Sequence, residues 1–343
     1  MSSTVTGYTC QMCGKEFATK TSYTYHVKQK NACTKTTVIK PILKWVGGKT
    51  QILDKLFALF PREMNNYHEV FLGGGSVLLA LLQQIKEGAI VLHGTIYAYD
   101  LNEPLIYVYK HIQSDYMALY NEVQILIDEF TSVPRQGVLN RSAASLEEAM
   151  VCKENYYYWT RARYNALSGE EKRNLLGSAL FIFLNKTCFR GVFRVGPNGF
   201  NVPYGNYDSP EIINLYHLKS VSELIQPVVF TSCDCLTALS ADNIQEGDFI
   251  YMDPPYAPEN ATSFVGYTDK GFPLEKHVLL FSRIEELTKE NKKCMLSNAD
   301  VELIHQYFDT ETYSISSILC KRAINSKSPD AKAKEVIITN WKA

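Results

Sequence analysis

The chain has 343 residues, of which 46% are hydrophobic and 21% are charged, and its formal net charge is -1 at pH 7. This length suggests two or three domains, and the composition is that of a globular protein with a sizeable buried core. The near-zero charge excludes a uniformly basic nucleic-acid binder. The longest apolar stretch, near residues 71–82, is interrupted by three glycines and is too short to span a bilayer, so we expect no membrane partner.

The positive charge is concentrated at the amino terminus. Residues 1–44 contain seven lysines and one acid, Glu16, so this segment carries about +6 and the remainder about -7. A basic arm on a near-neutral body is typical of a phosphate-binding segment, and equally of a solubilising tail. Nine cysteines in a long chain with no visible signal peptide argue against a secreted disulfide framework. We therefore expect an intracellular, reducing compartment.

The first 36 residues contain a pattern of metal ligands. Cys10 and Cys13 are separated by two residues, His26 follows after twelve more, and Cys33 comes last. Three thiolates and one imidazole can complete a tetrahedral zinc site, which would also supply the folding energy of so short a segment. The segment resembles a C2H2-type ββα finger with a cysteine as its last ligand, although the gap before Cys33 is longer than usual. The alternative is that these cysteines and the histidine are unrelated.

Strands and helices alternate along the rest of the chain. The expected helices are 51–60, 76–86, 104–129, 146–168 and 174–185, and the expected strands are 68–71, 96–100, 228–230, 248–252, 294–297 and 335–338. Residues 191–210, rich in Gly, Pro, Asn and aromatic residues, are expected to form a loop or hairpin. The alternation predicts an α/β doubly wound, Rossmann-like core, which residues 105–225 interrupt as an inserted helical domain.

One expected strand leads directly into Asp253-Pro254-Pro255-Tyr256. Ligands of α/β sheets bind beyond the carboxyl ends of strands, so this segment has the position of an active site. A carboxylate and the Pro254 carbonyl can accept the two N–H bonds of an exocyclic amino group and direct its lone pair toward a methyl donor, and Tyr256 can stack on an extruded base. The alternative is a proline-rich loop that only ends the strand.

A second group of residues indicates an adenosine-containing cofactor. Phe71, Gly73 and Gly75 lie at an expected strand-to-helix turn, where glycines allow close approach of a ligand. Asp100 ends the next strand, the position at which an acid binds ribose hydroxyls in nucleotide-binding folds. Asp234 either faces the adenine amino group or is a surface acid.

These motifs occur in an order that identifies a resemblance. Trp45-Val46-Gly47-Gly48-Lys49, Phe71 with its glycines, Asp100 and Asp253-Pro254-Pro255-Tyr256 resemble the GATC-type family of DNA adenine N6-methyltransferases, in its alpha class. The similarity covers about residue 40 to the carboxyl terminus. It implies a class I methyltransferase core, S-adenosylmethionine as cofactor and double-stranded DNA as substrate. It also implies that Trp45, Lys49, Asp100 and Asp253 bind the cofactor, with Lys49 on the methionine carboxylate and Asp100 on the ribose.

The insert resembles the family's DNA-reading hairpin over residues 185–194 and 200–205. The resemblance implies that Phe189 enters the duplex, that Arg194 reads a guanine edge by a bidentate contact, and that Lys44 contacts the first base of the site. Arg190 stands where the family usually has Asn, and Asn201 belongs to the same hairpin. The alternatives are core packing for Phe189, Phe193 and Trp45, and a phosphate contact for Arg194.

We therefore predict four parts: a zinc finger (1–36), two halves of the methyltransferase core (37–110 and 226–343) and a target-recognition insert (111–225). The expected activity is N6-methylation of adenine in a short palindromic site such as GATC or CATG, by a monomer. A restriction–modification system would add a cognate endonuclease as partner. One rival is cytosine N4-methylation, although the aspartate of the Asp-Pro-Pro-Tyr segment favours adenine. The other is an inactive zinc-finger DNA-binding protein.

Overall fold

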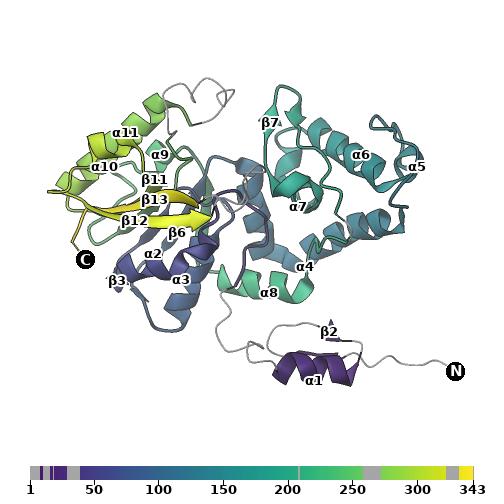
Figure 1. The fold of residues 1–343 in the computed structure, drawn as a ribbon, viewed down its shortest axis with the longest axis horizontal. Coiled ribbons are helices and arrows are strands. Elements are labelled where there is room, and N and C mark those ends of the chain that lie inside the picture. Colours follow the sequence, from purple (N-terminus) through teal and green to yellow (C-terminus); the bar gives the residue numbers. More distant parts are fainter. Residues whose placement is uncertain are drawn as a thin grey trace.

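The computed structural model describes residues 8–10, 16–17, 19–28, 39–207, 209–257, 272–321 and 332–342. A part built around a sheet and a helical part lie beside each other in Figure 1. The sheet has seven strands in the order β12-β13-β11-β10-β4-β6-β9. Their bounds are β4 Tyr67–Glu69, β6 Ile96–Asp100, β9 Val228–Ser232, β10 Phe249–Met252, β11 Lys293–Ala299, β12 Ser314–Lys321 and β13 Lys332–Thr339.

The connections of this sheet create a switch point between β4 and β10. From β4 the chain continues to β6 and β9 on one side, whereas β10 and β11 extend the sheet on the other side, all parallel to one another. β13 runs antiparallel to both β11 and β12. In open α/β sheets, ligands bind beyond the carboxyl ends of the strands at such a reversal. The ends of β4 and β10 are therefore the place where a site is expected.

Helices cover both faces of the sheet and form the second part of the molecule (Figure 1). Alternate residues of β10 belong to different cores, since Phe249 and Tyr251 pack in one apolar cluster and Ile250 and Met252 in the other. The helices of the sheet part are α2 Leu53–Leu59, α3 Ser76–Lys86, α8 Leu215–Leu224, α9 Cys235–Ala238, α10 Leu274–Lys289 and α11 Glu302–Tyr307. α4 Glu103–Ser132 leads from β6 toward α5 Leu146–Ala149, α6 Lys153–Ala166 and α7 Leu175–Thr187.

Asparagine side chains fix where two long helices begin. Asn102 accepts a hydrogen bond from the N–H of Leu105 at the start of α4, and Asn174 accepts one from Gly177 at the start of α7. Such caps satisfy N–H groups that have no partner within a helix. α4 and α7 pack against each other. The two caps therefore determine where each helix of this packed pair begins.

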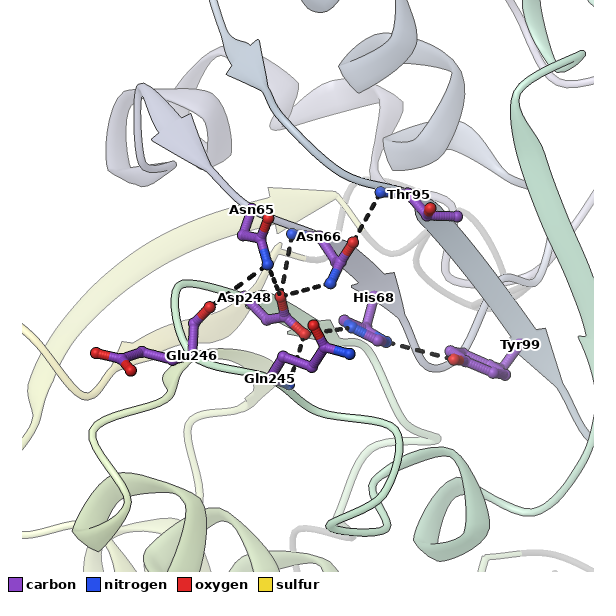
Figure 2. Close-up of polar contacts among 8 residues, drawn as sticks. All are labelled: Asn65, Asn66, His68, Thr95, Tyr99, Gln245, Glu246 and Asp248. Carbon is purple, nitrogen blue, oxygen red and sulfur yellow. Dashed lines mark hydrogen bonds and ion pairs between the residues drawn. The ribbon is translucent and has the colours of Figure 1, made fainter.

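A buried polar network joins the amino ends of β4 and β10 (Figure 2). Asp248 accepts hydrogen bonds from the backbone and side-chain amides of Asn66, at 3.1 and 2.8 Å, and its other oxygen lies 3.0 Å from His68 Nε2. His68 Nδ1 lies 3.3 Å from the hydroxyl of Tyr99 in β6. Burial would raise the pKa of Asp248, but the hydrogen bonds from His68, Gln245 and Asn66 hold it below its ordinary value. The network joins the amino ends of β4 and β10 to Tyr99 of β6 and so fixes these three strands relative to one another.

The predicted fold class is confirmed as a mixed α/β structure with a mostly parallel sheet. The helix over 76–86 and the strand over 96–100 have the predicted bounds. The single helix expected over 146–168 is wrong, because the extended backbone of Cys152 separates α5 from α6. The predicted boundary at 110/111 falls inside α4, and strand β12 was not foreseen.

Candidate active site

Lys49 and Asp253 form an ion pair at the carboxyl end of β10. The Nζ of Lys49, which is only 4% exposed, lies 2.7 Å from Oδ2 of Asp253. The same ammonium donates to the carbonyl of Gly47 at 2.9 Å and lies 5.0 Å from the centre of the Tyr256 ring. The N–H of Lys49 donates to Oγ of Ser76, which attaches this segment to the start of α3. One lysine therefore contacts both the carboxylate and the aromatic ring of the Asp-Pro-Pro-Tyr segment.

The electrostatics of Asp253 depend on this contact. Burial raises the pKa of Asp253 above its ordinary value, the Lys49 ammonium acts against this rise, and the neighbouring Glu335 adds to it. Lys49 thus favours the carboxylate form, which accepts hydrogen bonds but donates none. Pro254 is buried and Pro255 is exposed. Neither proline has an N–H, so the backbone beside Asp253 offers only carbonyl acceptors over these two positions.

The glycine turn after β4 fits closely against Trp45. Gly73 and Gly75 have positive φ angles of 49° and 70°, a region that favours glycine. A Cβ on Gly73 would lie 2.8 Å from Cδ1 of Trp45, and one on Gly75 would lie 2.6 Å from the hydroxyl of Tyr109. Asp100 accepts the N–H of Gly73 at 2.9 Å. The structure therefore brings together three predicted parts of a cofactor site: Trp45, the glycine turn and Asp100.

The donor and acceptor groups at this turn fit an adenosine-containing cofactor. Asp100 ends β6 with a carboxylate whose pKa is raised by burial, against the opposing effect of hydrogen bonds from the N–H groups of Asn102 and Gly73. Such a carboxylate can accept hydrogen bonds from ribose hydroxyls. Phe71 contacts Phe272 edge to face, with ring centres 5.7 Å apart. An aromatic ring, a close-approach glycine turn and a carboxylate are the components that a nucleoside requires.

Asp234 has local partners in the structure. Its side chain accepts a hydrogen bond from the N–H of Leu236 as the cap of α9, and it forms an ion pair with Lys276 of α10. These contacts, with burial as the opposing effect, lower the pKa of Asp234. Contact between Asp234 and a cofactor adenine stays a prediction.

A second group of predicted residues gathers where α7 ends. The side-chain amide of Asn185 bonds both the N–H and the carbonyl of Lys44, at 2.9 and 2.8 Å. The Nζ of Lys44 lies 4.2 Å from the centre of the Tyr207 ring. Burial, with the nearby charge of Lys44, lowers the pKa of Lys186 to about 8. Lys44 is thus attached to α7 rather than to the sheet, although it precedes Trp45 by one residue.

A short hairpin follows in the sequence, formed by β7 Val195–Gly196 and β8 Gly199–Phe200. Two exposed polar residues flank it, Arg194 and Asn201. Nε of Arg194 donates to Oδ1 of Asn201 at 2.6 Å, and the N–H of Asn201 donates to the carbonyl of Arg194 at 3.1 Å. The guanidinium is therefore held in one orientation at an exposed position.

The aromatic residues near the hairpin have different environments. Phe189 is 46% exposed, and the adjacent Arg190 has a positive φ of 57° and donates its N–H to the hydroxyl of Tyr207. Phe193 instead packs against Trp45 and Phe181, with ring centres 5.9 and 5.1 Å apart. Phe193 is thus a packing aromatic, as one alternative proposed, whereas nearly half of the Phe189 side chain is exposed.

The comparisons with known proteins agree with this geometry. The family model of D12 class N6 adenine-specific DNA methyltransferases matches residues 45–324. The chain belongs to this family. It is 34% identical to the Type II methyltransferase M.MjaIII of Methanocaldococcus jannaschii, over 88% of this chain and 99% of that protein. It is 29% identical to the Type II methyltransferase M1.LlaDCHI of Lactococcus lactis subsp. cremoris and 27% identical to the DNA adenine methylase of Escherichia coli K12, covering 88% of this chain and 96% and 95% of those proteins.

This D12 class enzyme is therefore a DNA adenine methyltransferase, as predicted. The rivals of cytosine N4-methylation and an inactive DNA-binding protein lose their support, because the family model is adenine-specific and relatives named as methyltransferases align over nearly their whole length. No helix in the part of the chain that the structure describes is long and apolar enough to cross a membrane.

The sequence reasoning missed one buried acid in the site of this methyltransferase. Glu69 ends β4, and the hydroxyl of Tyr67 donates to its Oε2 at 2.8 Å. Burial raises the pKa of Glu69 to about 8, against the hydrogen bond from Tyr67 and with a further rise from the charge of Asp253. An acid within an expected buried strand, two residues before Phe71, was the signal that could have identified it.

The amino-terminal segment lies outside the part matched by the methyltransferase family. β1 Tyr8–Thr9 and β2 Glu16–Phe17 pair antiparallel, and α1 Lys20–Lys28 follows them. Cys10 is 1% exposed, and the rings of Phe17 and His26 lie 4.7 Å apart. Cys13 and Cys33, two of the predicted zinc ligands, lie outside the described residues. Within the described ranges, no group of three or more His, Cys, Asp or Glu side chains could hold a metal ion.

Proposed function

We propose that this enzyme transfers the methyl group of S-adenosylmethionine to N6 of an adenine extruded from a short palindromic DNA site, such as GATC or CATG. The observation that carries this proposal is the contact of Lys49 with both Asp253 and Tyr256 at the switch point between β4 and β10. A carboxylate, an adjoining backbone carbonyl and an aromatic ring are the groups that a flipped base with an exocyclic amino group requires.

In this proposal Asp253 and the Pro254 carbonyl act on the target nitrogen. Its lone pair is delocalised into the purine ring, which makes it a poor nucleophile. Two acceptors, one for each N–H bond, favour a tetrahedral nitrogen whose lone pair points away from both. Tyr256 stacks on the base and holds it in that orientation. The bound cofactor supplies an electrophilic methyl group.

The cofactor is held by residues around the glycine turn and the carboxyl ends of β6 and β10. Lys49 pairs with the methionine carboxylate, Asp100 accepts the ribose hydroxyls, and the glycine turn allows the cofactor to approach the backbone. Lys49 is already in contact with Asp253. If its ammonium shifts toward the methionine carboxylate of the cofactor, its contact with Asp253, the residue that faces the target base, changes as well. The full set assigned to the cofactor is Trp45, Lys49, Phe71, Gly73, Gly75, Asp100, Asp234 and Asp253.

The duplex is read by the residues near the end of α7 and in the hairpin of β7 and β8. Phe189 enters the duplex, Arg194 reads a guanine edge from the orientation that Asn201 fixes, and Lys44 contacts the first base of the site. Arg190, in place of the family's usual Asn, faces the orphaned base. Residues 111–225 thus form the recognition insert between two core halves, 37–110 and 226–343.

We assign zinc to residues 1–36, with Cys10, Cys13, His26 and Cys33 as ligands. Three observations support this assignment: the order strand, strand, helix, the burial of Cys10, and the contact between the rings of Phe17 and His26. The finger adds an electrostatic anchor on DNA. Removal of residues 1–36 should remove one zinc per chain and weaken DNA binding, while the methylated sequence stays the same. A changed methylated sequence would contradict this role.

The overall proposal is tested by incubating the purified enzyme with unmethylated DNA and S-adenosylmethionine and mapping modified bases by single-molecule sequencing. We expect N6-methyladenine in one short palindromic motif. Modification scattered over unrelated sequences would contradict the site-specific assignment. We expect the enzyme to be a monomer, which sedimentation can check. A cognate endonuclease that cuts the same motif would place it in a restriction–modification system.

A further inference from the structure

The hydroxyl of Tyr256 has a charged partner from a distant part of the chain. It donates a hydrogen bond to Oε2 of Glu335 at 2.8 Å. Tyr256 follows β10, whereas Glu335 lies in β13, opposite Ala299 of β11 and Ile318 of β12. The segment that the family model matches ends at position 324, before Glu335.

The backbone beside Tyr256 is also fixed from β11. The N–H of Ala257 donates to Oδ1 of Asn298 at 3.0 Å, and Asn298 pairs with Val336, the residue after Glu335. The tyrosine is thus held at two points, its hydroxyl by β13 and the adjoining backbone by β11. With both points held, the Tyr256 side chain cannot swing away about its Cα–Cβ bond without breaking the hydrogen bond to Glu335, whereas rotation of the ring about its own long axis leaves that bond intact. A hydrogen bond to a carboxylate is stronger than one between neutral groups.

The position of the Tyr256 ring matters because Lys49 and Asp253 lie close to it. The Lys49 ammonium is 5.0 Å from the ring centre and 2.7 Å from Asp253, so the ring and the carboxylate both lie close to the same ammonium group. A base that stacks on this ring must at the same time present its amino group to Asp253. An error of about 1 Å in such an arrangement can reduce a rate a hundredfold.

We propose that Glu335 is a positioning residue, which fixes the Tyr256 ring for stacking with the target adenine. It acts through Tyr256 and need not touch the substrate. The inference rests on the proposed role of Asp253 and Tyr256. It explains why a carboxylate occurs on the antiparallel strand β13, one strand removed from β10 but within hydrogen-bond distance of the tyrosine that follows β10.

The test compares Glu335→Ala, Glu335→Gln, Tyr256→Phe and the double variant Glu335→Ala/Tyr256→Phe under single-turnover conditions, on a duplex with the mapped site. Glu335→Ala and Tyr256→Phe should each slow methyl transfer by about ten- to a hundredfold, and the double variant should be no slower than either, because both remove one interaction. Glu335→Gln should retain most of the rate, since its amide oxygen can still accept from Tyr256. Affinity for S-adenosylhomocysteine should be unchanged throughout.

The control is Glu302→Ala, which removes an exposed carboxylate of α11 and should leave the rate unchanged. Losses that multiply in the double variant, or a full rate in Tyr256→Phe, would overturn the inference, and Tyr256→Phe gives this answer even if Glu335→Ala fails to fold. Asp253→Ala distinguishes failure of the proposed catalytic site from failure of the positioning role of Glu335. If Asp253→Ala keeps its activity, the proposed site fails; if it is inactive while Glu335→Ala is fully active, only the positioning role fails.

Discussion

Nζ of Lys49 lies 2.7 Å from Oδ2 of Asp253 and 5.0 Å from the centre of the Tyr256 ring. The lysine assigned to the cofactor thus contacts both residues assigned to the target base. A cofactor carboxylate that attracts Lys49 competes with these contacts. In the proposed mechanism, cofactor binding and base binding are therefore linked through the Lys49 side chain.

Lys49→Met should weaken both stability and cofactor binding. It leaves the Asp253 carboxylate without its ammonium, and we expect the free energy of unfolding to fall by about 1–3 kcal/mol. Affinity for S-adenosylhomocysteine should fall by about tenfold or more, since one charged contact is lost. Urea unfolding and calorimetry measure the two effects. The control is Lys55→Met, which changes an exposed lysine of α2. Unchanged cofactor affinity in Lys49→Met would remove Lys49 from the cofactor site.

Glu69 predicts a pH dependence of stability. Its pKa is about 8 in the folded protein and near the ordinary value of 4.5 in the unfolded chain. Because the unfolded state releases this proton first, the contribution of Glu69 to stability is complete below pH 4.5 and is lost as pH rises toward 8. Glu69→Gln does not titrate and its amide oxygen can still accept from Tyr67. The variant should gain stability relative to the wild type between pH 5 and 8, by at most roughly 1.4 kcal/mol per pH unit. A difference that stays constant over urea unfolding at pH 5 to 9 would contradict the buried, neutral Glu69.

Gly75 and Tyr109 should behave as a coupled pair. Gly75→Ala places a Cβ at a φ of 70° and 2.6 Å from the Tyr109 hydroxyl, so we expect a loss of about 1–3 kcal/mol. Among the described residues that hydroxyl is buried without a hydrogen-bond partner, so Tyr109→Phe should be neutral or stabilising by up to about 1 kcal/mol. In the double variant part of the Gly75→Ala loss should be recovered. Thermal unfolding of the four proteins measures this, and purely additive effects would show that the contact carries no strain.

Arg194 should affect which base pair is accepted more than how tightly DNA is bound. Arg194→Ala removes the guanidinium that Asn201 orients, and discrimination at one base pair should fall by about 1–3 kcal/mol. Arg194→Lys should not restore it, because an ammonium cannot make the same bidentate contact. The measurement is kcat/KM on the mapped site and on single-substituted duplexes, with Arg62→Ala as the exposed-arginine control. A uniform loss over all duplexes would instead indicate a phosphate contact.

Local signals predicted much of the site. The end of β6 at Asp100 and the beginning of α3 after Gly75 follow from short-range sequence features, an apolar strand ended by an acid and a glycine turn ahead of an apolar helix. The Asp-Pro-Pro-Tyr segment was placed correctly because it follows a buried strand directly. Such features act over a few residues, and a single sequence contains them.

The contacts that complete the site depend on the tertiary arrangement. Glu335 reaches Tyr256 only because β13 runs antiparallel beside β11, and no spacing along the chain encodes that pairing. Trp45 packs against Phe193, almost 150 positions later in the chain, for a similar reason. The division of residues 146–168 into two helices depends on one extended residue, Cys152, inside a periodic pattern that favours a single helix.

The central claim is that Asp253 acts on the target adenine. The most direct test is methyl transfer by Asp253→Ala to a duplex with the mapped site, together with its unfolding curve and its binding of S-adenosylhomocysteine. The account predicts a folded protein with no detectable N6-methyladenine at times when the wild type has modified every site. N6-methyladenine formed by this variant at a rate near that of the wild type would contradict the account.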